Sequence, residues 1–261
     1  MRPDRPSDPA QRFIDYGDAP LAYTDEGGGP ALIAIPGLPG SVRDFRWLAP
    51  VLSTSMRVLR FDPPGYGSTG RTGFSGLTVA QRAEPVMALI EQLDLGPVTL
   101  AGHSAGAGVV AYLAAHRPEL VTAAAMIAPA GPKRHLARKP MQFFSGALRL
   151  PGARRAMNPL IRRMYAMRGF PAYLTDEERA FSMVDALAFD FADYRADLVR
   201  MHCPTLVAWA YDDAIIPPTT FEALEAMVPE GPRLRFDDGG HSVQKAHAEQ
   251  IGAAISDLVN L

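Results

Sequence analysis

The chain has 261 residues, of which 48% are hydrophobic and 21% are charged, and its formal net charge is −2. This composition is typical of a globular protein and excludes an intrinsically disordered chain, while the near-neutral charge disfavours a dedicated nucleic-acid binder. No apolar run reaches the roughly 18 residues of a transmembrane helix, and the polar start lacks a secretory signal. The one cysteine, Cys203, excludes an intramolecular disulfide. We therefore expect a cytoplasmic protein without stable membrane insertion.

Short apolar segments alternate with longer helical patterns along most of the chain. The strand candidates are Leu21–Thr24, Ala31–Ile35, Val58–Phe61, Pro97–Ala101, Val121–Ile127, Thr205–Trp209 and Leu234–Phe236. The helix candidates are Thr78–Leu93, Ala105–His116, Thr219–Met227 and Val243–Leu261. Because Gly27-Gly-Gly-Pro30 joins the first two strand candidates, these two are expected to form a hairpin. The alternation as a whole predicts an α/β fold with a mostly parallel sheet and helices on both faces.

Residues 133–199 break this alternation, because the pattern there is helical only. We expect a helical insertion over one edge of the sheet, with residues 1–132 and 200–261 forming the core domain. The prolines expected to break its helices are Pro140, Pro151, Pro159 and Pro171. Its first part, from Lys133 to Arg168, is basic and contains no acid. Such a run either steers an anionic substrate or a membrane surface, or forms the solvated face of helices.

The same insertion is rich in methionine and aromatic residues. They are Met141, Met157, Met164, Met167, Met183, Met201, Phe143, Phe144, Phe170, Phe181 and Tyr165. These side chains either line an adaptable apolar pocket for a substrate or form the core of the insertion itself.

The segment Gly102-His-Ser-Ala-Gly106 matches a G-x-S-x-G nucleophile elbow, with a strand candidate before it and a helix candidate after it. At such a sharp turn the serine has strained backbone angles, and only very small residues fit two positions away on either side. The turn raises the Ser104 hydroxyl out of the sheet. The pattern therefore predicts Ser104 as a nucleophile; the alternative is a structural turn with an inert serine.

A serine nucleophile needs a base, and the base needs an acid that orients it. Of the six histidines, His241 follows the last strand candidate and so lies at the edge where active-site residues of α/β sheets gather. We expect His103 to point away from Ser104 and His247 to be solvated on the last helix. Asp212 and Asp213 are the candidate acids, because both follow the strand candidate Thr205–Trp209.

Attack on a carbonyl creates a negative oxygen that preorganised donors must meet. The N–H of Ala105, directly after the nucleophile, is one candidate donor. The loop after Ala31–Ile35 should supply the second. Pro36 and Pro39 have no N–H, so Leu38 is the best candidate in that loop. The alternative is a simple Gly/Pro turn.

Together these motifs resemble the α/β-hydrolase superfamily, from about Tyr16 to Leu258. In the family's order they are Pro36–Ser41, Asp62–Ser68, Gly102–Gly106, Pro204–Pro217 and Gly240-His241. The resemblance implies about eight strands and a helical cap where the insertion lies. The family's acid loop usually reads Gly-x-x-Asp, so Asp213 matches the acid, with Ala210 in the place of the glycine. Pro36 stands where the family usually has a histidine that helps to hold the oxyanion loop.

The resemblance implies a serine hydrolase that cleaves a small carboxylic ester with an apolar moiety through an acyl-enzyme. Ser104, His241 and Asp213 would be its triad, with the amides of Leu38 and Ala105 as oxyanion donors. No metal or organic cofactor is needed. The same triad would also serve for a thioester, a lactone, a C–C bond or acyl transfer, and a non-catalytic ligand-binding module is the alternative outside enzymes. The motifs do not select among these bonds and do not indicate an oligomeric state.

Overall fold

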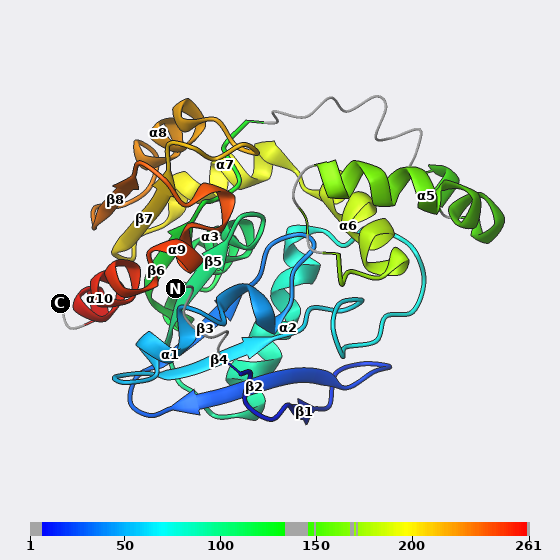
Figure 1. The fold of residues 1–261 in the computed structure, drawn as a ribbon. Coiled ribbons are helices and arrows are strands. Elements are labelled where there is room, and N and C mark those ends of the chain that lie inside the picture. The colour runs from blue at the N-terminus through cyan, green and yellow to red at the C-terminus, as the bar shows by residue number, and fades with distance from the viewer. Residues whose placement is uncertain (1–6, 134–145, 149, 168–169, 171, 260–261) are drawn as a thin grey trace.

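The computed structural model describes residues 7–133, 146–148, 150–167, 170 and 172–259 (Figure 1). The strands are β1 (Arg12–Ile14), β2 (Leu21–Gly27), β3 (Ala31–Ile35), β4 (Arg57–Phe61), β5 (Val98–His103), β6 (Val121–Ile127), β7 (Thr205–Ala210) and β8 (Arg233–Phe236). The α-helices are α1 (Ala49–Leu52), α2 (Val79–Gln92), α3 (Gly106–His116), α5 (Pro151–Met167), α6 (Asp176–Ala188), α7 (Phe191–Arg200), α8 (Pro218–Glu225), α9 (Val243–Ala246) and α10 (Ala248–Val259). Short 3-10 helices span Val42–Phe45 (η1), Pro118–Leu120 (η2) and Gly240–Ser242 (η3).

Within the described residues, the strands form one eight-stranded sheet with the order β1-β2-β4-β3-β5-β6-β7-β8. Strand β2 runs antiparallel to β1 and to β4, and all the other neighbouring strands are parallel. The predicted mostly parallel α/β fold is confirmed. Because parallel strands run in one direction, β3, β5, β7 and β8 all end at the same edge of the sheet, and the loops after them meet there.

The expected hairpin between the first two strand candidates is wrong. Strand β4 lies between β2 and β3, and Val58 pairs with Glu26 on one side and with Leu32 on the other. The turn at residues 27–30 therefore passes across the N-terminal end of β4. A side chain on Gly27 would collide with the carbonyl oxygen of Met56, so this turn lies directly against the segment that leads into β4.

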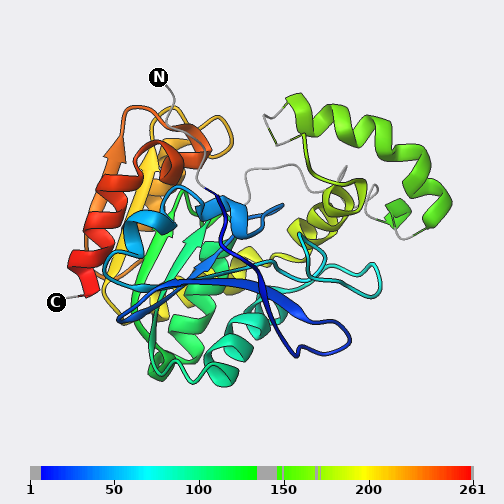
Figure 2. The ribbon, with the colours of Figure 1, turned by 60° about the horizontal axis from the view of Figure 1, so that its bottom comes forward.

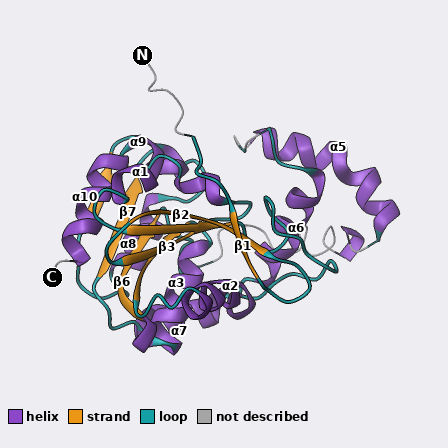
Figure 3. Cartoon of the chain, turned by 90° about the horizontal axis from the view of Figure 1, so that it is seen from below, coloured by secondary structure: helices purple, strands orange, loops and turns teal. Residues whose placement is uncertain are grey.

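Two helical layers cover the sheet (Figure 3). Helices α1, α9 and α10 lie on one face, and α2, α3 and α7 lie on the other. The hydrophobic core fills both interfaces, with Leu100 of β5 and Ile33 of β3 fully buried. Close approach of α10 to α1 depends on Gly252, where an added Cβ would lie 2.6 Å from Cγ1 of Val51.

The segment between β6 and β7 carries α5 and α6, which lie to one side of the sheet (Figures 1 and 2). They have a hydrophobic cluster of their own, made of Leu148, Ile161, Tyr165, Leu174, Ala180, Met183 and Val184, with Phe74, Met157, Met164 and Phe170 packed against it. Most of the described methionines and aromatics of the insertion thus form its own core. Met201 is buried in the main core, Met167 is 72% exposed, and Met141, Phe143 and Phe144 lie outside the described residues.

Two proline predictions for this segment have a clear outcome. Helix α5 begins at Pro151, where a missing N–H costs nothing. It then continues through Pro159, so the expected break there is wrong and the helix gives up one i→i−4 hydrogen bond instead. Pro140 and Pro171 lie outside the described residues.

Helix α6 is fixed to the 62–78 loop by a buried carboxylate. Asp185 accepts hydrogen bonds from the hydroxyl of Tyr66 at 2.9 Å, from both terminal nitrogens of Arg71 at 2.9 and 3.0 Å, and from the N–H of Leu77 at 2.8 Å. The side chains of Arg71 and Asp185 are only 4% and 1% exposed. This ion pair therefore holds the 133–199 segment against the rest of the molecule.

We expect Asp185→Asn to lower the free energy of unfolding by about 3–5 kcal/mol, because the buried guanidinium of Arg71 would lose its counter-charge. Urea denaturation measures this difference. Glu177→Gln is the matched control, because Glu177 is an exposed acid on the same helix, and it should change stability by no more than about 0.5 kcal/mol. Equal effects of the two substitutions would contradict the structural role of Asp185.

Candidate active site

Ser104 lies in the turn between β5 and α3 with φ of +52°, a left-handed conformation that few non-glycine residues adopt. Its N–H donates to the carbonyl of Ile127 at 2.9 Å, and its carbonyl accepts from the N–H of Ala130 at 2.9 Å. A Cβ on Gly102 would lie 2.7 Å from the carbonyl carbon of Gly106, and one on Gly106 would collide with the carbonyl oxygen of Ile35. Both glycines of the motif are therefore required by close packing around the serine.

Three predicted site residues meet at the edge of the sheet where the parallel strands end. Nε2 of His241 lies 2.8 Å from Oγ of Ser104, although the two residues are 137 positions apart. Nδ1 of the same ring lies 2.8 Å from Oδ2 of Asp213. A carboxylate only accepts, so Nδ1 carries the hydrogen and Nε2 is free to accept the hydroxyl proton of Ser104. This chain of hydrogen bonds has the geometry of a nucleophile, a base and an orienting acid.

The structure places Asp213, and not Asp212, against the imidazole. The Asp213 side chain is fully buried, and its Oδ1 accepts the N–H groups of Ile215 and Ile216 at 2.8 and 3.0 Å. Asp212 is exposed and accepts the N–H of Gly240 at 2.7 Å. Asp212 therefore fixes the backbone of the loop that carries His241, while Asp213 contacts the ring.

The surroundings of His241 and Asp213 set the charge of both groups. Burial lowers the pKa of His241, and this outweighs the opposite effect of the hydrogen bond to Asp213. Burial alone would raise the pKa of Asp213, but the hydrogen bonds from His241 and from two backbone amides lower it overall. At neutral pH the pair is therefore a neutral imidazole beside a carboxylate, the state in which Nε2 accepts a proton.

The 36–41 loop, which follows β3, lies against the serine. A Cβ on Gly37 would lie 3.1 Å from Cβ of Ser104, so the residue before Leu38 packs against the elbow. Ala105 lies at the start of α3, directly after Ser104. In the part of the chain that the structure describes, neither the N–H of Leu38 nor that of Ala105 donates a backbone hydrogen bond. Both amides are thus available at the elbow.

Asp44 holds this loop in place of the histidine that Pro36 replaces. Its Oδ2 accepts the N–H of Gly37 at 3.1 Å, and its Oδ1 accepts the N–H of Ser41 at 3.4 Å. Sequence reasoning missed Asp44. The available signal was the Ser41-x-x-Asp44 spacing, because Ser41 and Asp44 form a capping box at the start of η1.

Comparison with known proteins gives the family of the chain. A family model described as the alpha/beta hydrolase fold matches residues 30–248. The chain belongs to this family.

The curated relatives of this α/β hydrolase are named for different activities. The chain is 30% identical to a dihydrolipoyllysine-residue acetyltransferase component of an acetoin cleaving system from Pseudomonas putida, over 95% of this chain and 69% of that protein. It is 25% identical to a 2-hydroxy-6-oxononadienedioate/2-hydroxy-6-oxononatrienedioate hydrolase from the same species, over 93% and 92%. A thermophilic esterase from Thermogutta terrifontis shares the fold, with a TM-score of 0.78 at 21% identity over 97% of this chain and 98% of that one.

Two further histidines of this α/β hydrolase lie near the site, and only His247 differs from expectation. His103 does not contact the Ser104 hydroxyl, but its ring packs beside that of His241, with the ring centres 5.1 Å apart. His247 lies between α9 and α10, stacked on Phe236 and bonded through Nε2 to Asp238, so the prediction of a solvated position on one continuous helix is wrong. No local sequence pattern predicts either contact, because both depend on where the 237–242 loop lies.

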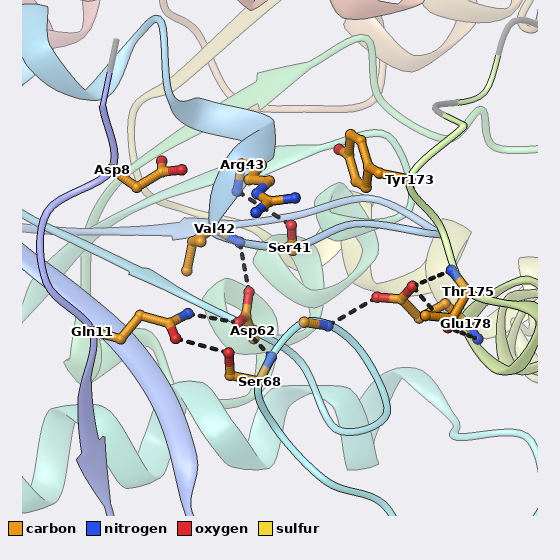
Figure 4. A pocket seen from close by; sticks show the side chains of 11 residues that line it. Asp8, Gln11, Ser41, Val42, Arg43, Asp62, Ser68, Tyr173, Thr175 and Glu178 are labelled. Carbon is orange, nitrogen blue, oxygen red and sulfur yellow. Dashed lines mark hydrogen bonds between the residues drawn. The ribbon is translucent and has the colours of Figure 1, made fainter.

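A cavity of about 340 Å³ opens beside the same α/β-hydrolase core (Figure 4). Its lining is Asp8, Gln11, Ser41, Val42, Arg43, Asp62, Gly67, Ser68, Tyr173, Thr175 and Glu178, which does not include Ser104, Asp213 or His241. Internal donors occupy its carboxylates: Asp62 accepts from Val42 and Ser68, and Glu178 accepts from Gly67. In the described part of the chain, no cluster of three His, Cys, Asp or Glu side chains is arranged to hold a metal.

Proposed function

We propose that the chain is a serine hydrolase that cleaves carboxylic esters through an acyl-enzyme intermediate, with Ser104, His241 and Asp213 as its triad. The observation that supports this most strongly is the pair of 2.8 Å contacts that join the serine to the imidazole and the imidazole to the buried carboxylate. The strained elbow, the lowered pKa of His241 and the two available amides all fit the same reaction.

In the proposed mechanism, His241 takes the proton of Ser104 as the serine attacks the ester carbonyl. The N–H groups of Leu38 and Ala105 stabilise the negative oxygen, and each such donor contributes about 3–4 kcal/mol in well-studied enzymes. His241 then gives its proton to the departing alcohol, leaving an ester on Ser104. Water, deprotonated by His241, attacks this ester and releases the carboxylic acid. Asp213 stabilises the imidazolium in both steps, and no metal or cofactor takes part.

We further propose that residues 133–199 cap the site, with 1–132 and 200–261 as the core domain, and that the substrate is a small ester with an apolar moiety. The charge of the basic stretch is partly offset, because Arg162 forms an ion pair with Asp176. Arg154 stacks on the ring of Phe74 and keeps its charge. Arg134, Arg138, Lys139, Arg149 and Arg168 lie outside the described residues.

None of the described helices is long and apolar enough to span a membrane. The cytoplasmic location stays a prediction.

A second candidate activity is acyl transfer, which the 30% identical relative named as an acetyltransferase component favours. The acyl-enzyme would then pass its acyl group to a thiol or an alcohol in place of water. Turnover of an activated acetyl ester with added dihydrolipoamide separates the two activities. Hydrolysis predicts acetate as the product at every concentration of dithiol, whereas transfer predicts an acetylated dithiol.

A fluorophosphonate probe tests the proposal against a non-catalytic binding module. The probe forms a stable bond only with a serine that a neighbouring base activates. We expect labelling at Ser104, located by mass spectrometry, together with turnover of p-nitrophenyl esters. An unlabelled, folded protein without turnover on esters and thioesters of graded chain length would support the binding module.

The pH dependence of kcat/KM follows from the state of His241. Only the neutral ring accepts the proton of Ser104, so activity falls as the pH drops through the pKa of His241. Because burial lowers this pKa below its usual 6.5, we expect half of the maximal kcat/KM at a pH below 6.5. A pH series with a neutral ester substrate measures it. A midpoint above 6.5 would show that the ring is more exposed or more strongly stabilised as a cation than the structure indicates.

A further inference from the structure

Helix α5 presents large apolar side chains to solvent at the outside of the molecule. Figures 1 and 2 show α5 as the outermost helix of the 133–199 segment, with α6 between it and the sheet. Leu160 and Met167 of this helix are 57% and 72% exposed, and Leu150, directly before it, is 64% exposed. Single exposed apolar residues are normal, but three on one short segment require an explanation.

Two of these residues belong to one stripe along α5. Leu160, Arg163 and Met167 recur at intervals of three and four residues, so they lie on the same side of a helix with 3.6 residues per turn. The opposite side buries Ile161 and Tyr165 in the hydrophobic cluster that α5 shares with α6. The exposed stripe is therefore not the side that holds α5 in the fold.

The exposed side of α5 also carries an uncompensated positive charge. The helix contains four arginines and no aspartate or glutamate. Arg162 pairs with Asp176, at the start of α6. Arg155 and Arg163 are exposed, and neither has an ion-pair partner among the described residues. Apolar side chains and free guanidinium groups thus lie together on one surface, the outer face of α5.

We propose that the outer face of α5 docks on an anionic lipid membrane, with Leu160 and Met167 inserted below the headgroups and Arg155 and Arg163 at the lipid phosphates. A helix with arginines beside its apolar side chains lies in the interface of such a membrane. The arginines attract the protein to an anionic leaflet, and the apolar side chains gain free energy by leaving water. This contact requires no helix that spans the membrane.

The charges favour a membrane over other occupants of this face. A second copy of the chain would bring the arginines of one α5 near those of the other, and α5 offers no acid to pair with them. A nucleic acid would pair with the arginines but would leave Leu160 and Met167 without apolar partners. An anionic membrane provides phosphates and an apolar interior side by side, so it complements both components of the face.

Co-sedimentation with vesicles tests the docking in the Ser104→Ala protein, in which lipid esters are not cleaved. We expect this protein to pellet with vesicles of phosphatidylcholine and phosphatidylglycerol and to stay in solution with phosphatidylcholine alone. Binding should weaken as salt rises, because salt screens exposed charges. No binding to the anionic vesicles, or equal binding to both kinds, would overturn the proposal. Since no turnover is measured, the result is independent of the proposed esterase function.

Two double substitutions test the two components of the face. Arg155→Gln/Arg163→Gln removes the free charges, Leu160→Gln/Met167→Gln removes the apolar side chains, and glutamine keeps the helix propensity. Each basic residue near an anionic surface contributes about fivefold to binding, so the arginine pair should lower the partition coefficient by at least about tenfold. The apolar pair should lower it by a similar factor, because both side chains lose their burial in the membrane.

Val199→Gln/Arg200→Gln is the matched control, because it removes one exposed apolar residue and one exposed arginine from the end of α7. Its vesicle binding should match that of the parent, and all variants should melt as the parent does. Full binding by either α5 variant, or an equal loss in the control, would contradict docking through α5. A dimer in solution that Leu160→Gln/Met167→Gln dissociates would also overturn it, and would assign the face to a second copy.

Discussion

Replacing Ser104 with alanine should reduce the turnover of p-nitrophenyl butyrate by at least about a thousandfold, because no other group can take the acyl chain and only binding and the oxyanion donors remain. Alanine has the same Cβ as serine and meets the same strain at φ of +52°. The hydrogen bonds that hold the turn come from the backbone of Ser104, so they persist. The fold and the melting temperature should therefore stay unchanged while kcat falls.

Ser242→Ala is the matched control for this experiment. Ser242 is an exposed serine directly after His241, and its side chain does not cap α9. Its loss should leave kcat within about twofold, as expected for an exposed position. If Ser104→Ala kept full activity, the nucleophile would be a different residue. If it lost both activity and the cooperative melt, the loss would reflect unfolding and not chemistry.

The parts of the fold that sequence predicts best are those with local signals. The apolar runs of β5, β6 and β7 stand out because buried parallel strands are continuously hydrophobic, and the structure confirms all three. Ser104, Asp213 and His241 also have a local signal in the sequence. Each follows directly on a strand candidate, and parallel strands end at one edge. Sequence order therefore predicts their convergence, although they are far apart along the chain.

The parts that sequence does not predict depend on which elements become neighbours. Strand β1 has three residues, two of them exposed, and so lacks an apolar signal. The pairing of β4 between β2 and β3 overrides a local turn pattern that is typical of a hairpin. His103 lies beside Asp44 and the backbone of His241 because η1, β5 and the 237–242 loop meet in space. A single sequence shows these residues but not their contacts.

Asp213→Asn should lower kcat by about 10⁴-fold, the loss known for this exchange when an amide reverses the tautomer of the base. The reason lies in the two backbone donors at Asp213. The N–H groups of Ile215 and Ile216 both point at Oδ1 and require an oxygen there. The amide NH₂ of asparagine must therefore take the position of Oδ2, where it donates to Nδ1 of His241. The hydrogen of the ring then moves to Nε2, which faces Ser104 and no longer accepts its proton. Steady-state kinetics and the ring ¹⁵N signals of His241 measure both effects.

Asp212→Asn provides the matched control, because the two aspartates are adjacent and the exchange is the same. Asp212 accepts one N–H, from Gly240, and the amide oxygen of asparagine accepts it equally well. Asp212 makes no contact with the ring, so the tautomer of His241 stays as it is and kcat should change by less than about threefold. The opposite ranking, with the larger loss in Asp212→Asn, would assign the orienting acid to Asp212. It would also mean that the 237–242 loop rearranges when substrate binds, since only a shift of that loop brings the imidazole from one carboxylate to the other.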